Sequence, residues 1–200
     1  MEISVKAIGE CAANCYIVEK TLMIDPGDDT GALDRFIAET GADIKTVIIT
    51  HGHFDHLLGA AHMKEKYGAR LLISEPDAPA LYDRDTAIVP AYSLTPFTPV
   101  KADAFLQPGK TELLGRECEI ISTPGHTPGG ICLYFPAEKV MFTGDTLFAH
   151  GYGRTDFPGG DVGQLIESLR RLLKMDSDIT VYPGHYEEAT LDRIRRGYYR

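Results

Sequence analysis

A six-residue segment of this chain, His51–His56, carries four side chains that can bind a metal ion. The segment reads His-Gly-His-Phe-Asp-His. In extended chain the imidazoles of His51 and His53 project to one side, because alternate residues share a face. Asp55 and His56 can then turn toward a neighbouring ion, since imidazole and carboxylate groups are both metal ligands. We therefore predict a metal site in which one short loop serves two ions.

Three further candidate ligands follow apolar segments at wide intervals: His126, Asp145 and His185. Each comes directly after a glycine, and glycine and proline fix unusual backbone angles that hold a ligand still. Asp25, before Pro26 and Gly27, has a similar setting. It fits a residue that orients the ligands, and equally a plain strand-ending turn. We expect all of these residues in loops at strand ends.

Short apolar segments rich in β-branched residues predict nine strands. They lie near residues 2–8, 14–19, 21–25, 45–50, 69–73, 117–122, 131–135, 139–143 and 179–182. Residues 84–110 contain four prolines and little periodicity, which predicts a long loop. Periodicity alone leaves open whether the strands form one α/β sheet or two sheets packed face to face.

Helical spacing of apolar residues predicts helices over 29–40, 57–67 and 162–174. The last is expected to have Asp161 as its cap and basic residues near its C-terminal end. Its predicted apolar stripe comprises Val162, Leu165, Ile166, Leu169, Leu172 and Leu173. We assign this helix to the scaffold rather than to the site.

The chain has 200 residues, 44% of them hydrophobic, which suits a single domain over 1–200. Its formal charge of −9 disfavours nucleic acid and anionic membranes as partners. No signal peptide or membrane-spanning segment is evident, so a cytoplasmic location is expected. The four scattered cysteines are interpreted as small buried hydrophobic residues rather than as disulfides or a structural zinc site.

An ordered series of motifs closely resembles the metallo-β-lactamase superfamily, in its glyoxalase II (hydroxyacylglutathione hydrolase) and persulfide dioxygenase branch. The motifs are Asn14–Val18, Asp25–Gly27, Thr50–His56, Thr123–Gly130, Phe142–Phe148, Gly153–Phe157 and Tyr182–His185. The resemblance implies an α/β (α+β) fold, an αββα four-layer sandwich with metals at one edge of the β layers. Only 15 residues follow His185, so the C-terminal helical domain of full-length glyoxalase II is not expected.

The resemblance also implies a ligand set. His51, His53 and His126 would bind one metal, Asp55, His56 and His185 the other, and Asp145 would bridge them. Two divalent ions are expected, zinc first, with iron or manganese as alternatives. Such a pair lowers the pKa of a shared water and polarises a carbonyl. The expected activity is hydrolysis of an anionic small-molecule thioester, hydroxyacylglutathione-like, or a related ester.

Two alternatives stay open at this point. A persulfide dioxygenase of the same branch would hold one iron through His51, His126 and Asp145. A non-catalytic binding module stabilised by metal would keep the same ligands. The ending Pro183–His185 is more glyoxalase-like and favours hydrolysis. The sequence does not specify the acyl group, the thiol carrier or the oligomeric state.

Residues around the ligands receive more specific roles. Asp55 is the catalytic candidate, because it can orient the attacking hydroxide or receive its proton. Arg154 is expected to pair with Asp156 or to face substrate. Tyr152 and Tyr186 are interpreted as cleft-wall residues or as partly exposed loop aromatics. His62 and His150 match no ligand motif and are not expected to bind metal.

Overall fold

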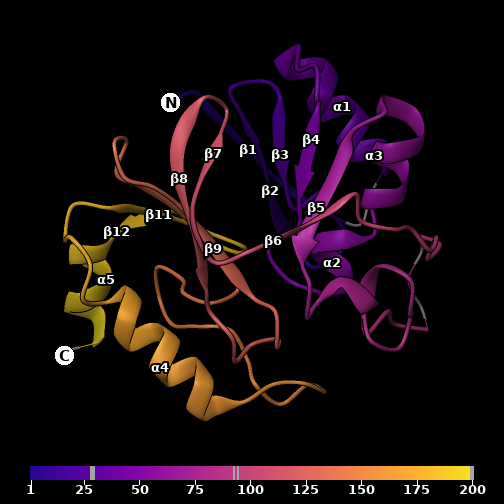
Figure 1. Cartoon of the computed structure of the whole chain (residues 1–200). Coiled ribbons are helices and arrows are strands. Elements are labelled where there is room, and N and C mark those ends of the chain that lie inside the picture. The colour runs from indigo at the N-terminus through magenta and orange to yellow at the C-terminus, as the bar shows by residue number, and fades with distance from the viewer. Residues whose placement is uncertain (28–29, 92, 94, 199–200) are drawn as a thin grey trace. The chain divides into compact units, whose positions relative to one another are not determined.

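The computed structural model describes residues 1–27, 30–91, 93 and 95–198. The chain divides into two compact units, Met1–Leu106 (unit 1) and Gln107–Arg200 (unit 2). Each unit contains one six-stranded sheet (Figure 1). Periodicity left open whether the strands form one sheet or two, and the structure has two. That the two units together form a single domain stays a prediction.

The sheet of unit 1 has its strands in sequence order. Strands β1, β2 and β3 are antiparallel neighbours, whereas β3 to β6 run parallel. Parallel neighbours end at the same edge of the sheet, so the loops that follow β3, β4 and β5 gather there. The bounds are β1 Ile3–Ile8, β2 Ala13–Val18, β3 Leu22–Ile24, β4 Thr46–Ile48, β5 Arg70–Ser74 and β6 Ala104–Leu106.

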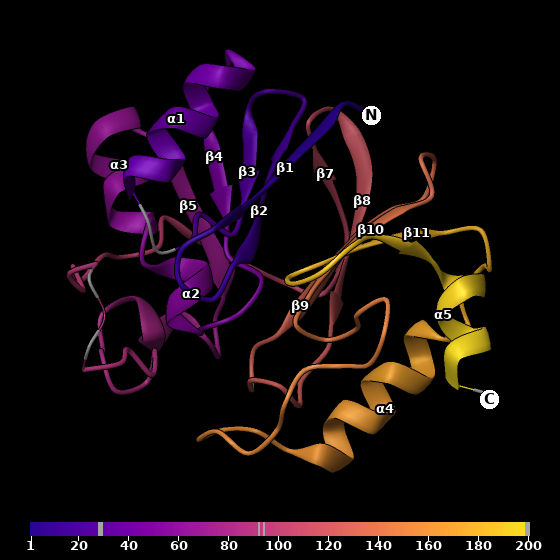
Figure 2. The same ribbon diagram turned by 180° about the vertical axis from the view of Figure 1, so that it is seen from behind.

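Helices α1 (Thr30–Thr40) and α3 (Ala60–Tyr67) lie on one face of this sheet (Figures 1 and 2). Leu33 and Phe36 of α1 and Met63 of α3 pack there against strand side chains in one buried cluster. Alternate strand residues such as Val18 and Leu22 are buried as well. Strands β2 and β3 are buried at every position, and β4 and β5 at every position but the first, which matches their near-continuous apolar runs.

The predicted helix over 57–67 is wrong in detail, because the structure has two helices, α2 (Phe54–Leu57) and α3. The amide of Gly59 donates to the carbonyl of Gly27 at 2.8 Å instead of continuing the helical ladder. A Cβ at Gly59 would lie 2.6 Å from Leu33 Cδ1 and 2.7 Å from the Pro26 carbonyl oxygen. This close approach requires glycine, and it separates the turn that carries Asp55 and His56 from α3.

The sheet of unit 2 has the order β12-β11-β10-β9-β8-β7. Its pairs are antiparallel except for β10 and β11, which run parallel. The bounds are β7 Gly109–Leu113, β8 Arg116–Ser122, β9 Ile131–Phe135, β10 Val140–Gly144, β11 Thr180–Pro183 and β12 Ala189–Thr190. Helices α4 (Val162–Leu172) and α5 (Leu191–Tyr198) cover one face of this sheet (Figure 2).

All nine predicted strands are confirmed, within one or two residues at their ends. Asp29, the predicted first residue of α1, lies outside the described residues. The predicted loop over 84–110 is wrong at its C-terminal end, where β6 lies and β7 begins. Strand β6 has only three residues, and β7 is mostly exposed, so neither has the apolar signal of a buried strand. The 3-10 helix η1 (Ala78–Leu81), α5 and β12 were not predicted either.

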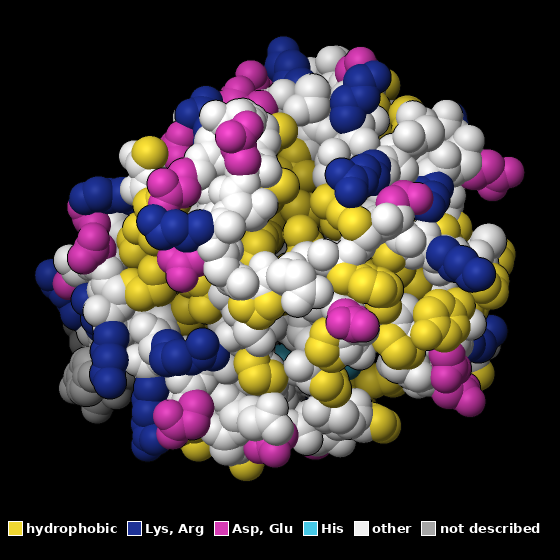
Figure 3. Space-filling view, in the orientation of Figure 1, with side chains coloured by type: hydrophobic (Ala, Val, Ile, Leu, Met, Phe, Trp, Pro, Cys, Tyr) yellow, Lys and Arg dark blue, Asp and Glu magenta, His cyan; other side chains and the backbone are white. Residues whose placement is uncertain are grey.

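The surface and the cysteines agree largely with the sequence interpretation. On the face drawn in Figure 3, positive and negative side chains of the described residues lie interspersed. Cys15, Cys118 and Cys132 are buried, and burial raises their thiol pKa values, to about 12 for Cys118 and Cys132. Cys11 is exposed, so the buried interpretation is wrong for this residue. Among the described residues, no helix has the length and apolarity needed to cross a membrane.

Helix α4 buries a narrower stripe than the sequence predicted. Leu165, Leu169 and Leu172 are buried, but Val162 is 58% and Ile166 42% exposed. The predicted cap is confirmed, since Asp161 Oδ1 accepts a hydrogen bond from the Gln164 amide at 3.0 Å. The exposed pair lies at the edge of the stripe, where it adds little to the core of unit 2.

We predict that Leu172→Ala lowers the free energy of unfolding by about 3 kcal/mol, because it removes a fully buried side chain and leaves a cavity. Ile166→Ala on the same helix should cost less than about 1 kcal/mol, since that side chain is partly in water. Urea unfolding followed by circular dichroism measures both. Equal losses for the two variants would contradict this burial pattern.

Candidate metal centre

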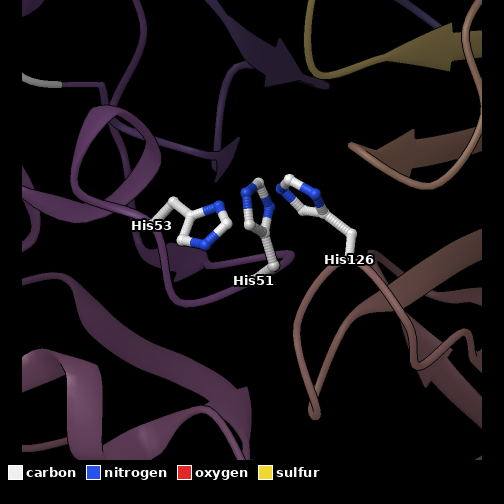
Figure 4. A group of neighbouring side chains, drawn as sticks. All are labelled: His51, His53 and His126. Carbon is white, nitrogen blue, oxygen red and sulfur yellow. The ribbon is translucent and has the colours of Figure 1, made fainter. Parts of the chain in front are cut away.

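In unit 1 the candidate ligands lie where parallel strands end. Asp25 directly follows β3, and the loop after β4 carries His51 and His53 (Figure 4). The Asp25 amide donates to the Ile48 carbonyl at 2.9 Å, which holds the two strand ends together. Asp25 adopts a φ of 53°, a left-handed conformation uncommon for a residue other than glycine. The sheet edge therefore carries the side chains that the sequence predicted as a cluster.

Three imidazoles and a carboxylate share this loop. The ring centroid of His51 lies 5.0 Å from that of His53 and 4.2 Å from that of His56. Asp55 Oδ2 lies 3.7 Å from His56 Nε2. All four residues are buried, and buried polar groups of this kind need partners. The short helix α2, which begins directly after His53, positions Asp55 and His56.

The Asp25 carboxylate is the hub of a buried hydrogen-bond network. Its Oδ1 accepts from the Thr50 amide at 2.7 Å, and its Oδ2 accepts from the Thr50 hydroxyl at 2.7 Å. The same Oδ2 lies 3.0 Å from His56 Nδ1. The Thr50 Oγ1 atom in turn lies 3.0 Å from His51 Nδ1. Asp25 is therefore linked to one histidine directly and to a second through Thr50.

This network sets the tautomers of both rings. A carboxylate only accepts hydrogen bonds, so His56 Nδ1 donates to Asp25 and Nε2 carries the lone pair. The Thr50 hydroxyl donates its only hydrogen to Asp25, so Thr50 Oγ1 accepts a hydrogen bond from His51 Nδ1. His51 then also presents Nε2 as the lone-pair atom. Two imidazoles of unit 1 are thus prepared as metal ligands.

A second carboxylate braces the backbone of the loop. Asp77, which is buried and follows β5, accepts a hydrogen bond from the Gly52 amide at 2.7 Å. A Cβ at Gly52 would lie 3.0 Å from Ala80 Cβ, so the loop approaches η1 closely. Asp77 was not among the predicted site residues. It follows Pro76, four residues after the predicted strand 69–73, and this proline-containing turn was the available signal.

In unit 2 the candidate ligands also follow strands. Asp145 comes directly after β10, and His185 comes two residues after the end of β11. These strands are parallel, so the two loops share one sheet edge, and the Gly184 amide donates to the Gly144 carbonyl at 2.8 Å. The register shifts between Phe142 and Gly144, which bends β10 just before Asp145. His126 lies in the turn after β8 (Figure 4).

Asp145 lies between two imidazoles of its own unit. Its Oδ2 is 3.6 Å from His126 Nε2 and 3.4 Å from His185 Nε2. His126 Nδ1 lies 2.7 Å from the Arg154 carbonyl oxygen, which can only accept, so Nδ1 donates and Nε2 carries the lone pair. Gly153 permits this contact, because a Cβ there would lie 2.0 Å from the Asp145 carbonyl oxygen and 2.8 Å from His126 Nδ1.

Helix α4 holds the turn that carries His126. The Asp161 amide donates to the Gly125 carbonyl at 2.8 Å, and the Ser168 hydroxyl donates to the Pro124 carbonyl at 2.9 Å. Gly125 has a φ of 132°, and a Cβ there would lie 2.2 Å from the Leu165 amide nitrogen. Only glycine fits this approach. The helix assigned to the scaffold thus contacts the ligand turn directly.

The predicted ion pair of Arg154 with Asp156 is confirmed. The guanidinium donates through Nε at 2.7 Å and through Nη2 at 2.6 Å to the two carboxylate oxygens. This bidentate contact lowers the pKa of Asp156 to about 2. The guanidinium also lies over the Phe157 ring, 3.8 Å from its centroid. Both charged residues are exposed, so the pair shapes a surface loop whose backbone orients His126.

The remaining predicted residues lie apart from these ligand groups or on the surface. Tyr152 is 51% and Tyr186 70% exposed. The Tyr186 ring centroid lies 6.2 Å from that of His185, and its φ of 67° is unusual for an aromatic residue. His62 Nε2 of α3 lies 2.8 Å from Asp34 Oδ1 of α1, and His150 is exposed beside Glu187.

These donors fit a metal. In unit 1, ligand atoms of Asp25, His51 and His56 all lie within 4.8 Å of one another, and all three residues are buried. Nitrogen and carboxylate ligands of this kind accept zinc, iron and manganese. Since both oxygens of Asp25 already accept from Thr50 and His56, we interpret Asp25 as the residue that orients the ligands.

The family is shown by comparison with known proteins. The model of the family "Metallo-beta-lactamase superfamily" matches residues 8–185. Hydroxyacylglutathione hydrolase GloC of Haemophilus influenzae is 34% identical, over 98% of this chain and 96% of its own length. The chain belongs to the metallo-β-lactamase superfamily, in the branch that the sequence motifs indicated.

Solved structures agree on the fold. A crystal structure of TTHA1623 in a di-iron-bound form is 32% identical, with a TM-score of 0.87, over 97% of this chain and 98% of its own. A structure of ETHE1 from Myxococcus xanthus is 25% identical, with a TM-score of 0.76, over 98% and 83% of the two chains. The predicted fold class, two mixed sheets with flanking helices in the αββα metallo-β-lactamase type, is confirmed.

We predict that Asp25→Asn lowers metal affinity about 10- to 100-fold, because an amide cannot accept hydrogen bonds at both of its ends. Competition with a chelator measures the affinity. Asp34→Asn is the matched control, since Asp34 also pairs with a histidine of unit 1 but lies outside the ligand loop. A similar loss for both variants would show that Asp25 acts only through general stability.

Proposed function

We propose that this chain is a metal-dependent hydrolase that cleaves a thioester, hydroxyacylglutathione-like, or a related ester. Membership of a superfamily of metallo-hydrolases and the similarity to GloC support this proposal. GloC matches this chain over nearly its whole length. This near-complete match supports a glutathione thioester as the proposed substrate class.

The observation that carries the proposal is the position of Asp145 within unit 2. One carboxylate oxygen lies near the Nε2 atoms of both His126 and His185. This arrangement suits a carboxylate that bridges two ions with one of these histidines on each. In the proposed site, His51 and His53 complete the ligands of the first ion, and Asp55 and His56 those of the second. Zinc is the first candidate, with iron or manganese as alternatives.

The bound ions would supply a water of lowered pKa and a Lewis acid for the carbonyl. The residues of the chain supply orientation and a proton acceptor. Asp55 is buried and lies beside His56 Nε2, so it is held where it can accept the proton of an attacking water. A thiolate leaves without prior protonation, so a thioester needs this base but no separate acid.

We propose an anionic small molecule as substrate, without nucleic acid or membrane partners, and action in the cytoplasm. The overall charge of −9 keeps anionic polymers away, whereas a cation pair attracts a small anion locally. Arg154 is engaged with Asp156, so we assign it to loop structure. Tyr152 and Tyr186 are the proposed contacts for the non-reacting part of the substrate, because both present exposed rings beside ligand loops.

We expect His126→Ala to remove most thioester hydrolysis and to lower metal content, because His126 is a proposed ligand. His62→Ala should leave both nearly unchanged, since His62 pairs with Asp34 instead. Elemental analysis and a thioester and lactone panel measure the two effects. His185→Ala should reduce the bound metal from about two ions to about one per chain.

The same measurements separate the alternatives. One iron per chain, retained in His185→Ala, together with persulfide-dependent oxygen uptake, would identify the dioxygenase that uses His51, His126 and Asp145. Full metal occupancy with neither hydrolysis nor oxygen uptake would favour a binding module. Equal activity of His126→Ala and His62→Ala would reject the proposed ligand set.

Tyr186→Ala should raise the KM for a thioester about tenfold with little change in kcat, because it removes apolar contact made equally in the ground and transition states. Tyr186→Phe keeps the ring and should behave like the parent protein. Steady-state kinetics provides the test. An unchanged KM in Tyr186→Ala would place the substrate away from this residue.

A further inference from the structure

A cavity of about 460 Å³ lies wholly within unit 1, and none of the proposed metal ligands lines it. Its size falls within the usual range for small-molecule sites. Three small apolar residues line it, Ala78, Pro79 and Ala102, together with two aromatic rings, Tyr82 and Phe105. The two charged lining residues have opposite signs, Glu75 and Lys101. Nothing in the proposed hydrolysis uses this cavity.

The walls of this cavity are fixed by hydrogen bonds. The Val100 amide donates to the Leu81 carbonyl at 2.9 Å, which joins η1 to the segment before β6. Lys64 Nζ donates to the Lys101 carbonyl at 2.9 Å and to Asp103 Oδ1 at 2.8 Å. Asp103 Oδ2 accepts from the Leu71 amide at 2.8 Å. The cavity is therefore preformed, and a ligand would not have to order its walls.

The two rings remain largely in water. Tyr82 is 56% and Phe105 48% exposed, both large apolar side chains beside one cavity. An aromatic group placed between them would remove apolar surface from water on both sides. The site therefore favours a ligand with a planar apolar group.

The two charged lining residues of the cavity indicate which charges a ligand would carry. In the described part of the chain, the side chains of Glu75 and Lys101 form no hydrogen bond or ion pair. A ligand of one charge would be attracted by one residue and repelled by the other, whereas a zwitterion satisfies both. Glu75 follows the carboxyl end of β5, and Lys101 precedes the amino end of its parallel neighbour β6. The two charges thus belong to opposite ends of the strand pair, which favours an elongated zwitterion.

We propose that this cavity binds a short free peptide with an aromatic side chain. The peptide ammonium group pairs with Glu75, its carboxylate pairs with Lys101, and its ring lies at Tyr82 and Phe105. A tripeptide spans about 10 Å, long enough to separate its two terminal charges. The site involves none of the proposed metal ligands, so it stands independently of the proposed function.

The test uses the peptide Gly-Phe-Gly as its probe. The chain has no tryptophan, so Tyr82→Trp places a single fluorescent reporter in the cavity. We expect a saturable emission change with a Kd of about 1 mM, ordinary for a ligand of this size. Ile166→Trp, a reporter on an exposed residue of α4 in unit 2, should not respond.

Capped peptides test each charge separately. N-acetylation removes the ammonium group and amidation removes the carboxylate, and each should weaken binding about tenfold. In calorimetry without the tryptophan reporter, Glu75→Ala and Lys101→Ala should each bind Gly-Phe-Gly about tenfold more weakly than the parent protein. Lys66→Ala, whose partner is Asp34, should bind the peptide as the parent protein does. Gly-Ala-Gly should bind more weakly than Gly-Phe-Gly.

Absence of saturation up to about 10 mM in both fluorescence and calorimetry would overturn the proposal. So would equal binding of the capped and free peptides, because the charges then play no part. Equal responses of the Tyr82→Trp and Ile166→Trp reporters would place the peptide elsewhere. None of these results depends on metal content or on hydrolysis, so this inference and the proposed function fail separately.

Discussion

The buried Asp25 carboxylate is the interaction on which the ligand loop of unit 1 depends. It accepts hydrogen bonds from the Thr50 amide, the Thr50 hydroxyl and His56 Nδ1. A buried carboxylate without such partners costs several kcal/mol, so the network both stabilises Asp25 and fixes the loop. The same bonds decide which nitrogen of His51 and of His56 keeps its lone pair for a ligand role. Stability and ligand chemistry thus rest on one group.

In unit 2, backbone atoms orient the imidazole of His126 in a similar way. The carbonyl of Arg154 sets the tautomer of His126, and the amide and hydroxyl groups of α4 hold the turn that carries it. Glycines at 125 and 153 allow backbone and ring to approach more closely than any Cβ would permit. Each unit therefore orders its own imidazoles through contacts made within that unit.

The sequence predicted the parts of the structure that depend on local pattern. Apolar β-branched runs indicated nine of the strands, and Asp25, Asp161 and the pair Arg154 and Asp156 were assigned from their immediate neighbours. Contacts between distant segments were not predictable in this way. Asp77 binds Gly52 across 25 residues, and the break at Gly59 depends on Leu33 and Pro26. The short or exposed strands β6 and β7 had too little apolar periodicity to be detected.

The contact between α4 and the Pro124–Gly125 turn ties one imidazole to a helix at the surface of unit 2. Local opening of that helix would release the turn while most strand pairing persists. Heating would then displace the His126 side chain in a step that leaves the far-ultraviolet spectrum of the sheets nearly intact. Amide protons of Asp161 and Leu165 would report that opening by exchanging earlier than those of β9 and β10.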